Sequence, residues 1–144
     1  MKNILVTIDF SEQESLLVDK ALEIATAFKS KVWVLHIAAP DPDFVGYGVG
    51  PQYIRDSRAE ELRDEHRKLQ EYASRFTAKG IEAEGLLIQG STIEMVMAEA
   101  EKLNIDLIIV GRQEHGFLYK AFVGSVSAEI IKESKIPVLI VPLV

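Results

Sequence analysis

The chain has 144 residues, of which 48% are hydrophobic and 26% charged, the composition of an ordinary globular protein that we expect to fold as one domain over residues 1–144. Its formal net charge is −6, so neither nucleic acid nor an anionic membrane is an expected partner. The absence of cysteine excludes disulfides, thiolate metal sites and cysteine nucleophiles. The apolar run at residues 4–8 is too short for a signal peptide or a membrane span, so we expect a cytoplasmic protein.

Short apolar runs, most of them rich in valine and isoleucine, predict strands that are buried on both faces. They occupy residues 4–8, 32–37, 83–88, 107–110 and 138–141. Between them, apolar residues recur at helical spacing. The four stripes are Leu17, Ala21, Ile24, Ala25 and Phe28; Leu62, Leu69, Tyr72 and Phe76; Ile93, Val96, Met97, Ala100 and Leu103; and Val126, Ile130 and Ile131. The predicted order is therefore βαβαβαβαβ.

Local signals mark several helix ends. Ser11 with Glu14, and Ser91 with Glu94, have the spacing of a capping box, and Gly80 is placed to end the second helix. Strands that alternate with helices predict a parallel sheet with helices on both faces. Ligands of such sheets bind beyond the carboxyl ends of the strands, where the strand order reverses. The places to examine are Asp9, the glycine-rich residues 46–50, and the segment that starts at Gly111.

The segment of residues 111–127 runs from the end of the fourth strand to the start of a helix. Free backbone N–H groups and the helix dipole at Gly124, Ser125, Val126 and Ser127 favour an anion such as phosphate. The same residues also fit a tight turn at Gly124 followed by an ordinary N-cap at Ser125. Local chemistry alone leaves both interpretations open.

The sequence as a whole resembles the universal stress protein family. The resemblance covers the whole chain and rests on its opening Ile-Leu-Val-Thr-Ile-Asp-Phe-Ser, the Asp-Leu-Ile-Ile-Val-Gly of the fourth strand, the Gly-Ser-Val-Ser turn and the closing Ile-Pro-Val-Leu-Ile-Val-Pro. It implies an open five-stranded parallel sheet of α/β class, Rossmann-like and similar to the adenine nucleotide alpha hydrolases, with strand order 3-2-1-4-5. It also implies homodimers through the last strand.

The resemblance further implies an adenine-nucleotide site for ATP, ADP or AMP, with Mg²⁺ as a candidate companion ion. The residues assigned to the phosphate loop are Gly111, Arg112, Gly116, Gly124, Ser125, Val126 and Ser127. Asp9 is placed near the ribose or adenine, where a carboxylate can accept hydrogen bonds, and Thr7, Ile37 and Val110 would wall the base. The alternative for Asp9 is that it only ends the first strand.

One departure from the family pattern bears on function. Glu114 stands where the family has its second glycine. A residue other than glycine at positive φ costs about 1 kcal/mol, and a carboxylate near a phosphate adds about 1–3 kcal/mol of repulsion. Together these terms predict nucleotide binding weakened about 10- to 1,000-fold, unless Glu114 points to solvent or a Mg²⁺ ion bridges it to the phosphates.

Two hypotheses follow: a nucleotide-binding regulatory module of the stress response, and a scaffold that has lost nucleotide and acts through protein contacts. No strong general base is evident for the γ-phosphate, so any ATP hydrolysis should be slow.

The stretch at residues 46–51 ends in Pro51 and is not a dinucleotide fingerprint; we expect a surface loop or a flap over the site. The three histidines are too scattered to form a metal site. A phosphoacceptor receiver domain is excluded, because the third strand ends without a carboxylate.

Overall fold

The computed structural model describes residues 1–10, 12–38, 52–89, 93–112 and 126–143. Strands and helices alternate along the described chain in the predicted order. They are β1 (Asn3–Thr7), α1 (Glu14–Phe28), β2 (Lys31–Ala38), α2 (Gln52–Thr77), β3 (Ala83–Gln89), α3 (Ile93–Lys102), β4 (Leu107–Arg112), α5 (Val126–Glu133) and β5 (Val138–Pro142).

The strands form one parallel sheet in the order β3-β2-β1-β4-β5, as predicted. β1 is central: its Val6 pairs with Val34 of β2 on one side and with Ile109 of β4 on the other. The order reverses between β1 and β4, so the carboxyl ends of these two strands mark the switch point where ligands bind in open α/β sheets.

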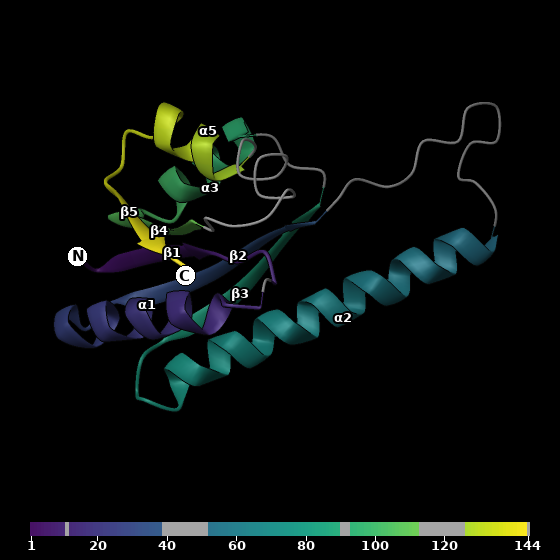
Figure 1. Ribbon diagram of the computed structural model, residues 1–144, viewed down its shortest axis with the longest axis horizontal. Coiled ribbons are helices and arrows are strands. Elements are labelled where there is room, and N and C mark those ends of the chain that lie inside the picture. Colours follow the sequence, from purple (N-terminus) through teal and green to yellow (C-terminus); the bar gives the residue numbers. More distant parts are fainter. Residues whose placement is uncertain (11, 39–51, 90–92, 113–125, 144) are drawn as a thin grey trace.

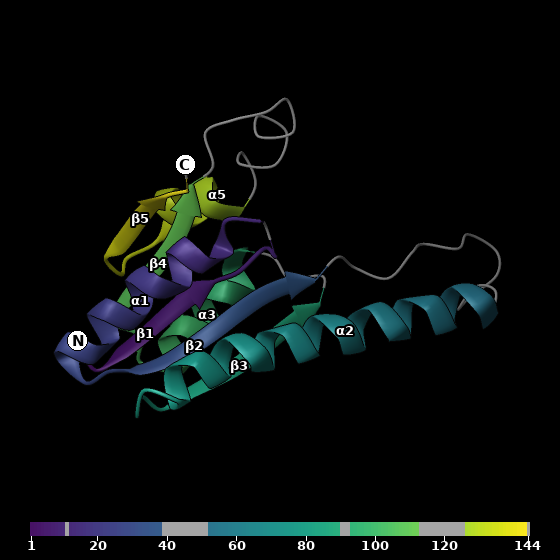
Figure 2. The ribbon, with the colours of Figure 1, turned by 60° about the horizontal axis from the view of Figure 1, so that its bottom comes forward.

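Each face of the sheet packs against a pair of helices. α1 and α2 lie on one side of the strands, and α3 and α5 lie on the other (Figures 1 and 2). Successive residues of a strand point to opposite faces, so Ile4 and Val6 belong to the core under α1 and α2, whereas Leu5 belongs to the core under α3 and α5. Burial on both faces explains why the strands read as nearly continuous apolar runs.

The first helix differs from its sequence prediction at both ends. α1 begins at Glu14 with Gln13 as its N-cap, and no side chain caps it; Ser11 lies outside the described residues. The Glu14 carboxylate accepts the backbone N–H of Asp9 at 3.2 Å. The predicted apolar stripe is wrong at Phe28, which is 57% exposed, because the stripe extends past the point where the helix still covers the sheet.

α2 is longer than its apolar stripe, which began at Leu62 in the sequence prediction. Its C-terminal half packs on β2 and β3, while its N-terminal half extends beyond the sheet (Figure 1). The predicted stop at Gly80 is confirmed: this glycine has φ +79°, and the N–H of Ile81 returns to the carbonyl of Phe76 at 3.0 Å. The second predicted capping residue, Ser91, lies outside the described residues.

β3 and β5 are the edge strands, which confirms the expectation that the fifth strand is at an edge. Among the described helices, none is both long and apolar enough to cross a membrane.

Candidate functional site

The switch point between β1 and β4 brings together the described residues that the sequence placed in a nucleotide site. β1 ends at Thr7, β4 ends at Arg112, and α5 begins at Val126. The two strands are direct neighbours in register, so their carboxyl ends lie side by side. The arrangement therefore has the topology that the sequence analysis required.

Thr7, Ile37 and Val110 point to the same face of the sheet, the one covered by α3 and α5. Val110 is a fully buried member of the core on that face, and Ile37 packs against it in part. Thr7 is half-buried and lies two residues after Leu5, which belongs to the same core. These three residues thus form the end of an apolar layer just below the carboxyl edge of the sheet.

Asp9 follows this layer and is exposed. Its position is fixed from both sides along the chain. The N–H of Ile8 donates to the Leu35 carbonyl at 2.7 Å, and the Asp9 N–H donates to Glu14, which is only 1% exposed. The next residue, Phe10, has φ +62°. The Asp9 carboxylate is therefore an acceptor at the sheet edge, carried on a backbone held by hydrogen bonds.

A histidine that the sequence analysis set aside supports the same turn. The Nδ1–H of His36 donates to the Ile8 carbonyl at 2.7 Å, since a carbonyl can only accept, and its ring lies 4.3 Å from that of Phe10, measured between centroids. Its Nε2 is 3.7 Å from Oε2 of Glu65, a buried oxygen with no hydrogen-bond partner among the described residues. The position of His36 near the end of a strand could have placed it at the candidate site from sequence alone. Nothing in the sequence linked Glu65 to His36.

Gly111 points to the opposite face from Val110. A Cβ atom built on it would lie 2.6 Å from Cδ1 of Leu143 and 3.5 Å from Cδ2 of Leu17. The N–H of Leu143 also donates to the carbonyl of Arg112 at 2.7 Å. Whatever its relation to a ligand, this glycine has a packing reason of its own, which sequence reasoning missed because Leu143 is distant in the chain.

Several predicted site residues lie outside the described residues: Gly116, Gly124 and Ser125, together with Glu114. Val126 and Ser127 are the first two residues of α5. Within the described part of the chain there is no group of three histidine, aspartate or glutamate side chains that could hold a metal ion. What these residues offer chemically is one exposed carboxylate, an apolar layer beneath it, and a helix N-terminus.

A parallel sheet in the order β3-β2-β1-β4-β5, with helices on both faces, defines a protein of the doubly wound α/β class. Residues 1–142 match the model of the universal stress protein family, and the chain belongs to that family. It is 33% identical to universal stress protein A homolog 1 of Coxiella burnetii, covering 97% of this chain and 95% of that protein. It is 28% identical to the universal stress protein YxiE of Bacillus subtilis, covering 95% and 96%.

Solved structures of the family share the fold. A universal stress protein from Archaeoglobus fulgidus in complex with dAMP superposes with a TM-score of 0.66 at 21% identity, covering 97% of each chain. A family protein from Arabidopsis thaliana with AMP bound gives 0.68 at 17% identity, covering 99% of this chain and 92% of that one. A universal stress protein in complex with cAMP gives 0.68 at 23% identity, covering 99% and 98%.

Proposed function

We propose that this chain is an adenine-nucleotide-binding regulatory module of the stress response, with its site at the carboxyl edge of β1 and β4. The observation that carries the proposal is the exposed Asp9 carboxylate, held at the switch point by the contact of its N–H with Glu14. The binding of dAMP, AMP and cAMP by three proteins of the same fold supports an adenine nucleotide as the ligand class.

The groups present suit such a ligand. A carboxylate accepts hydrogen bonds from ribose hydroxyls or from the adenine amino group. The layer of Thr7, Ile37 and Val110 supplies the apolar side of the crevice. A phosphate would then lie toward the first residues of α5, Val126 and Ser127, where the helix dipole and the N–H groups of the first turn favour negative charge. Gly111, Arg112, Gly116, Gly124 and Ser125 remain proposed members of the phosphate loop.

The second candidate function is a scaffold that works without nucleotide. It is favoured by one observation, the carboxylate of Glu114 at a position that the family fills with glycine. Repulsion from a nearby phosphate would lower affinity, as estimated from the sequence. The same position allows a bridging Mg²⁺, so the ion has to be varied in the test.

The test is isothermal titration of the purified protein, first freed of co-purified nucleotide, with ATP, ADP and AMP in the presence and absence of Mg²⁺. Three variants accompany the wild type: Asp9→Asn removes the proposed acceptor charge, Glu114→Gly restores the family residue, and Asp64→Asn is the matched control. Asp64 is an exposed aspartate that pairs with Arg67 on α2 at 3.1 Å, away from the switch point.

We expect wild-type binding that falls about tenfold or more in Asp9→Asn and is unchanged in Asp64→Asn, since a hydrogen bond to a charged group contributes about 1.5–3 kcal/mol. Binding only in Glu114→Gly would refute the nucleotide function of the natural chain and establish the scaffold alternative. Binding that is equally strong in wild type and Asp9→Asn would place the nucleotide elsewhere.

Assembly is the other part of the proposal. β5 is an edge strand whose Ile140 is 40% exposed, and an uncovered apolar edge favours pairing with a second copy. We expect a symmetric homodimer through this strand. Sedimentation at micromolar concentration tests it: a dimer that Ile140→Lys converts to monomer supports the proposal, and a wild-type monomer contradicts it.

A further inference from the structure

A hollow lies on the other face of the sheet from the Thr7, Ile37 and Val110 layer. It has a volume of about 370 Å³, and the described residues that line it are Phe10, Lys68, Glu71, Tyr72 and Arg75. Phe10 comes from the turn after β1, and the others come from α2. This volume is at the low end of the roughly 300–1,000 Å³ typical of small-molecule sites, so it suits a ligand with one ring system.

Two aromatic rings give the hollow apolar walls. Phe10 and Tyr72 both pack, partly buried, against the core under α1 and α2. The ring of Phe10 is held there by a backbone with φ +62°, a conformation that is unfavourable for a bulky residue, and by the ring of His36 at 4.3 Å. A strained residue whose side chain lines a cavity is a reason to ask what the cavity binds.

The polar groups around these rings are incompletely paired. Within the described part of the chain, Lys68 and Glu71 have no ion-pair partner, and the Tyr72 hydroxyl has no hydrogen-bond partner. The Lys68 Nζ lies 5.4 Å from the centroid of the Phe10 ring, within cation–π range. Arg75 by contrast is engaged, because it bridges from α2 to Asp19 of α1.

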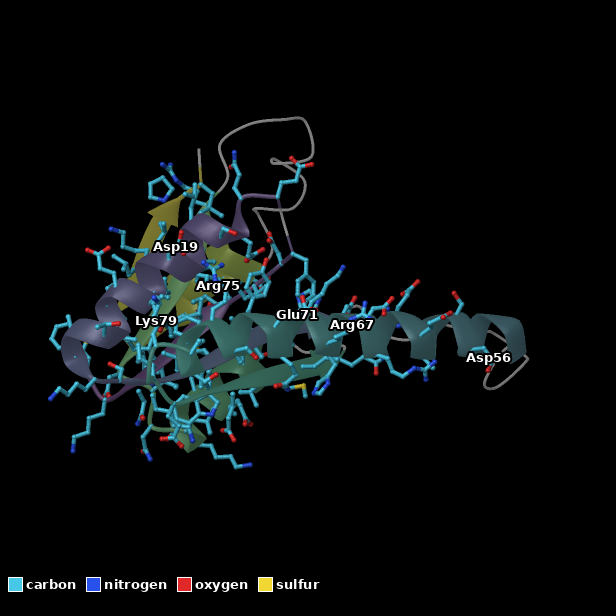
Figure 3. All side chains as sticks on the ribbon, turned by 90° about the horizontal axis from the view of Figure 1, so that it is seen from below. Asp19, Asp56, Arg67, Glu71, Arg75 and Lys79 are labelled. Carbon is cyan, nitrogen blue, oxygen red and sulfur yellow. The ribbon has the colours of Figure 1, made fainter. Side chains whose placement is uncertain are left out.

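Figure 3 shows the order of these charges along α2: Arg75 lies beside Asp19, Glu71 follows about one turn further from the helix end, and Arg67 lies beyond Glu71. The hollow therefore offers one ammonium and one carboxylate about one helical turn apart, since Lys68 and Glu71 are three residues apart on the same helix. A ligand that carries both an anionic and a cationic group could pair with both.

The charges on the described lining balance once internal pairing is counted. Lys68 and Arg75 are cationic and Glu71 is anionic, and the guanidinium of Arg75 pairs with Asp19. Burial, followed by the carboxylate of Glu14, raises the pKa of the Tyr72 phenol, so its hydroxyl is neutral and can donate or accept a hydrogen bond. Such a lining suits a ligand whose own charges balance.

We infer that this hollow, formed by Phe10 and the Lys68–Arg75 face of α2, binds a small aromatic zwitterion of the amino-acid class. The ring lies between Phe10 and Tyr72, the carboxylate pairs with Lys68, and the ammonium pairs with Glu71. Its described lining lies under α1 and α2, whereas the layer proposed for the nucleotide base lies under α3 and α5. Phe10 directly follows Asp9 in the chain, so the two sites share one turn.

The test uses L-phenylalanine as the probe, with phenethylamine and phenylacetate as analogues that lack its carboxylate and its ammonium. Binding is followed by two-dimensional NMR of the whole chain, with the ring signals of Phe10 and Tyr72 as reporters. The variants are Lys68→Gln and Glu71→Gln. Arg67→Gln is the matched control, since Arg67 precedes Lys68 on the same helix, is exposed and does not line the hollow.

We expect Lys68→Gln to weaken the binding of phenylalanine about 3- to 5-fold, as for a partly exposed ion pair. The binding of phenethylamine should be unchanged, because it has no carboxylate. Glu71→Gln should weaken the binding of phenylalanine and phenethylamine but not that of phenylacetate. Arg67→Gln should leave the binding of all three probes unchanged. The inference is overturned if phenylalanine shifts no signal of Phe10 or Tyr72 at about 20 mM, if phenylacetate binds as tightly as phenylalanine, or if Arg67→Gln has the effect of Lys68→Gln.

Discussion

Substituting Gly111 with alanine tests whether this glycine is required for packing. The new Cβ would lie 2.6 Å from Cδ1 of Leu143 and 3.3 Å from its Cγ. Carbon atoms prefer about 3.5–4.0 Å, so the end of the leucine side chain has to move by about 1 Å. Leu143 is only 2% exposed and belongs to the core, so this movement disturbs close-packed neighbours.

Overpacking of this kind costs about 1–3 kcal/mol, and replacing glycine in a strand regains about 0.5–1 kcal/mol. We therefore expect Gly111→Ala to lower the free energy of unfolding by up to about 2.5 kcal/mol. In a chain that already carries Leu143→Ala the clash is absent, so the same substitution should be neutral or stabilising by up to about 1 kcal/mol. The two substitutions should thus couple by at least about 1 kcal/mol.

The assay is urea unfolding of the four proteins at one fixed concentration, followed by the fluorescence of Trp33, the single tryptophan, which is 6% exposed on β2. A coupling free energy within about 0.5 kcal/mol of zero would refute the contact. Gly111 would then have to be explained by a ligand rather than by Leu143. Nucleotide titration of the same variants would separate the two roles.

Two further stability predictions rest on single residues. Lys29 ends α1 at φ 55° and ψ 46° and is exposed, so Lys29→Gly should raise the free energy of unfolding by about 0.5–1 kcal/mol, and a loss of stability in the same urea assay would contradict this. The N–H groups of Asn3 and Lys2 hold the pKa of Asp106 below its ordinary value. Above pH 4 to 5 the free energy of unfolding of the wild type should therefore exceed that of Asp106→Asn by less than about 1 kcal/mol. This difference should disappear as the pH falls through the lowered pKa. Urea unfolding between pH 3 and 7 checks this, and a difference that does not vary with pH would argue against it.

The strands and their order could be predicted because a buried parallel strand leaves a strong signal, a short run of valine and isoleucine, and because the family motifs placed those runs. The stop at Gly80 was equally predictable, since its positive φ is a local requirement. The exposure of Phe28 and the residue at which α1 begins could not be predicted in this way. Whether an apolar residue at a helix end is covered depends on how far the partner element reaches, which periodicity does not encode.

Some features of the candidate site could likewise be predicted from the sequence, and others could not. Asp9 was predictable from its position after a buried strand, and the structure adds the contact of its N–H with Glu14, the residue that the sequence placed in a capping box with Ser11. The hollow beside Phe10 was beyond sequence reasoning, because it exists only where the turn after β1 meets the middle of a long helix. The same is true of the contact between Gly111 and Leu143.

The central place of β1 in the sheet has a consequence for synthesis on the ribosome. β1, β2 and β3 emerge before β4 and can already pair through contacts such as Leu5 with Trp33. The other edge of β1 stays open until Leu107 and its neighbours arrive to pair with Ile4. During that interval an apolar strand edge is exposed, the kind of surface on which nascent chains associate wrongly. We therefore expect the emerging chain to depend on chaperones most while its first three strands are complete and β4 is still in the exit tunnel.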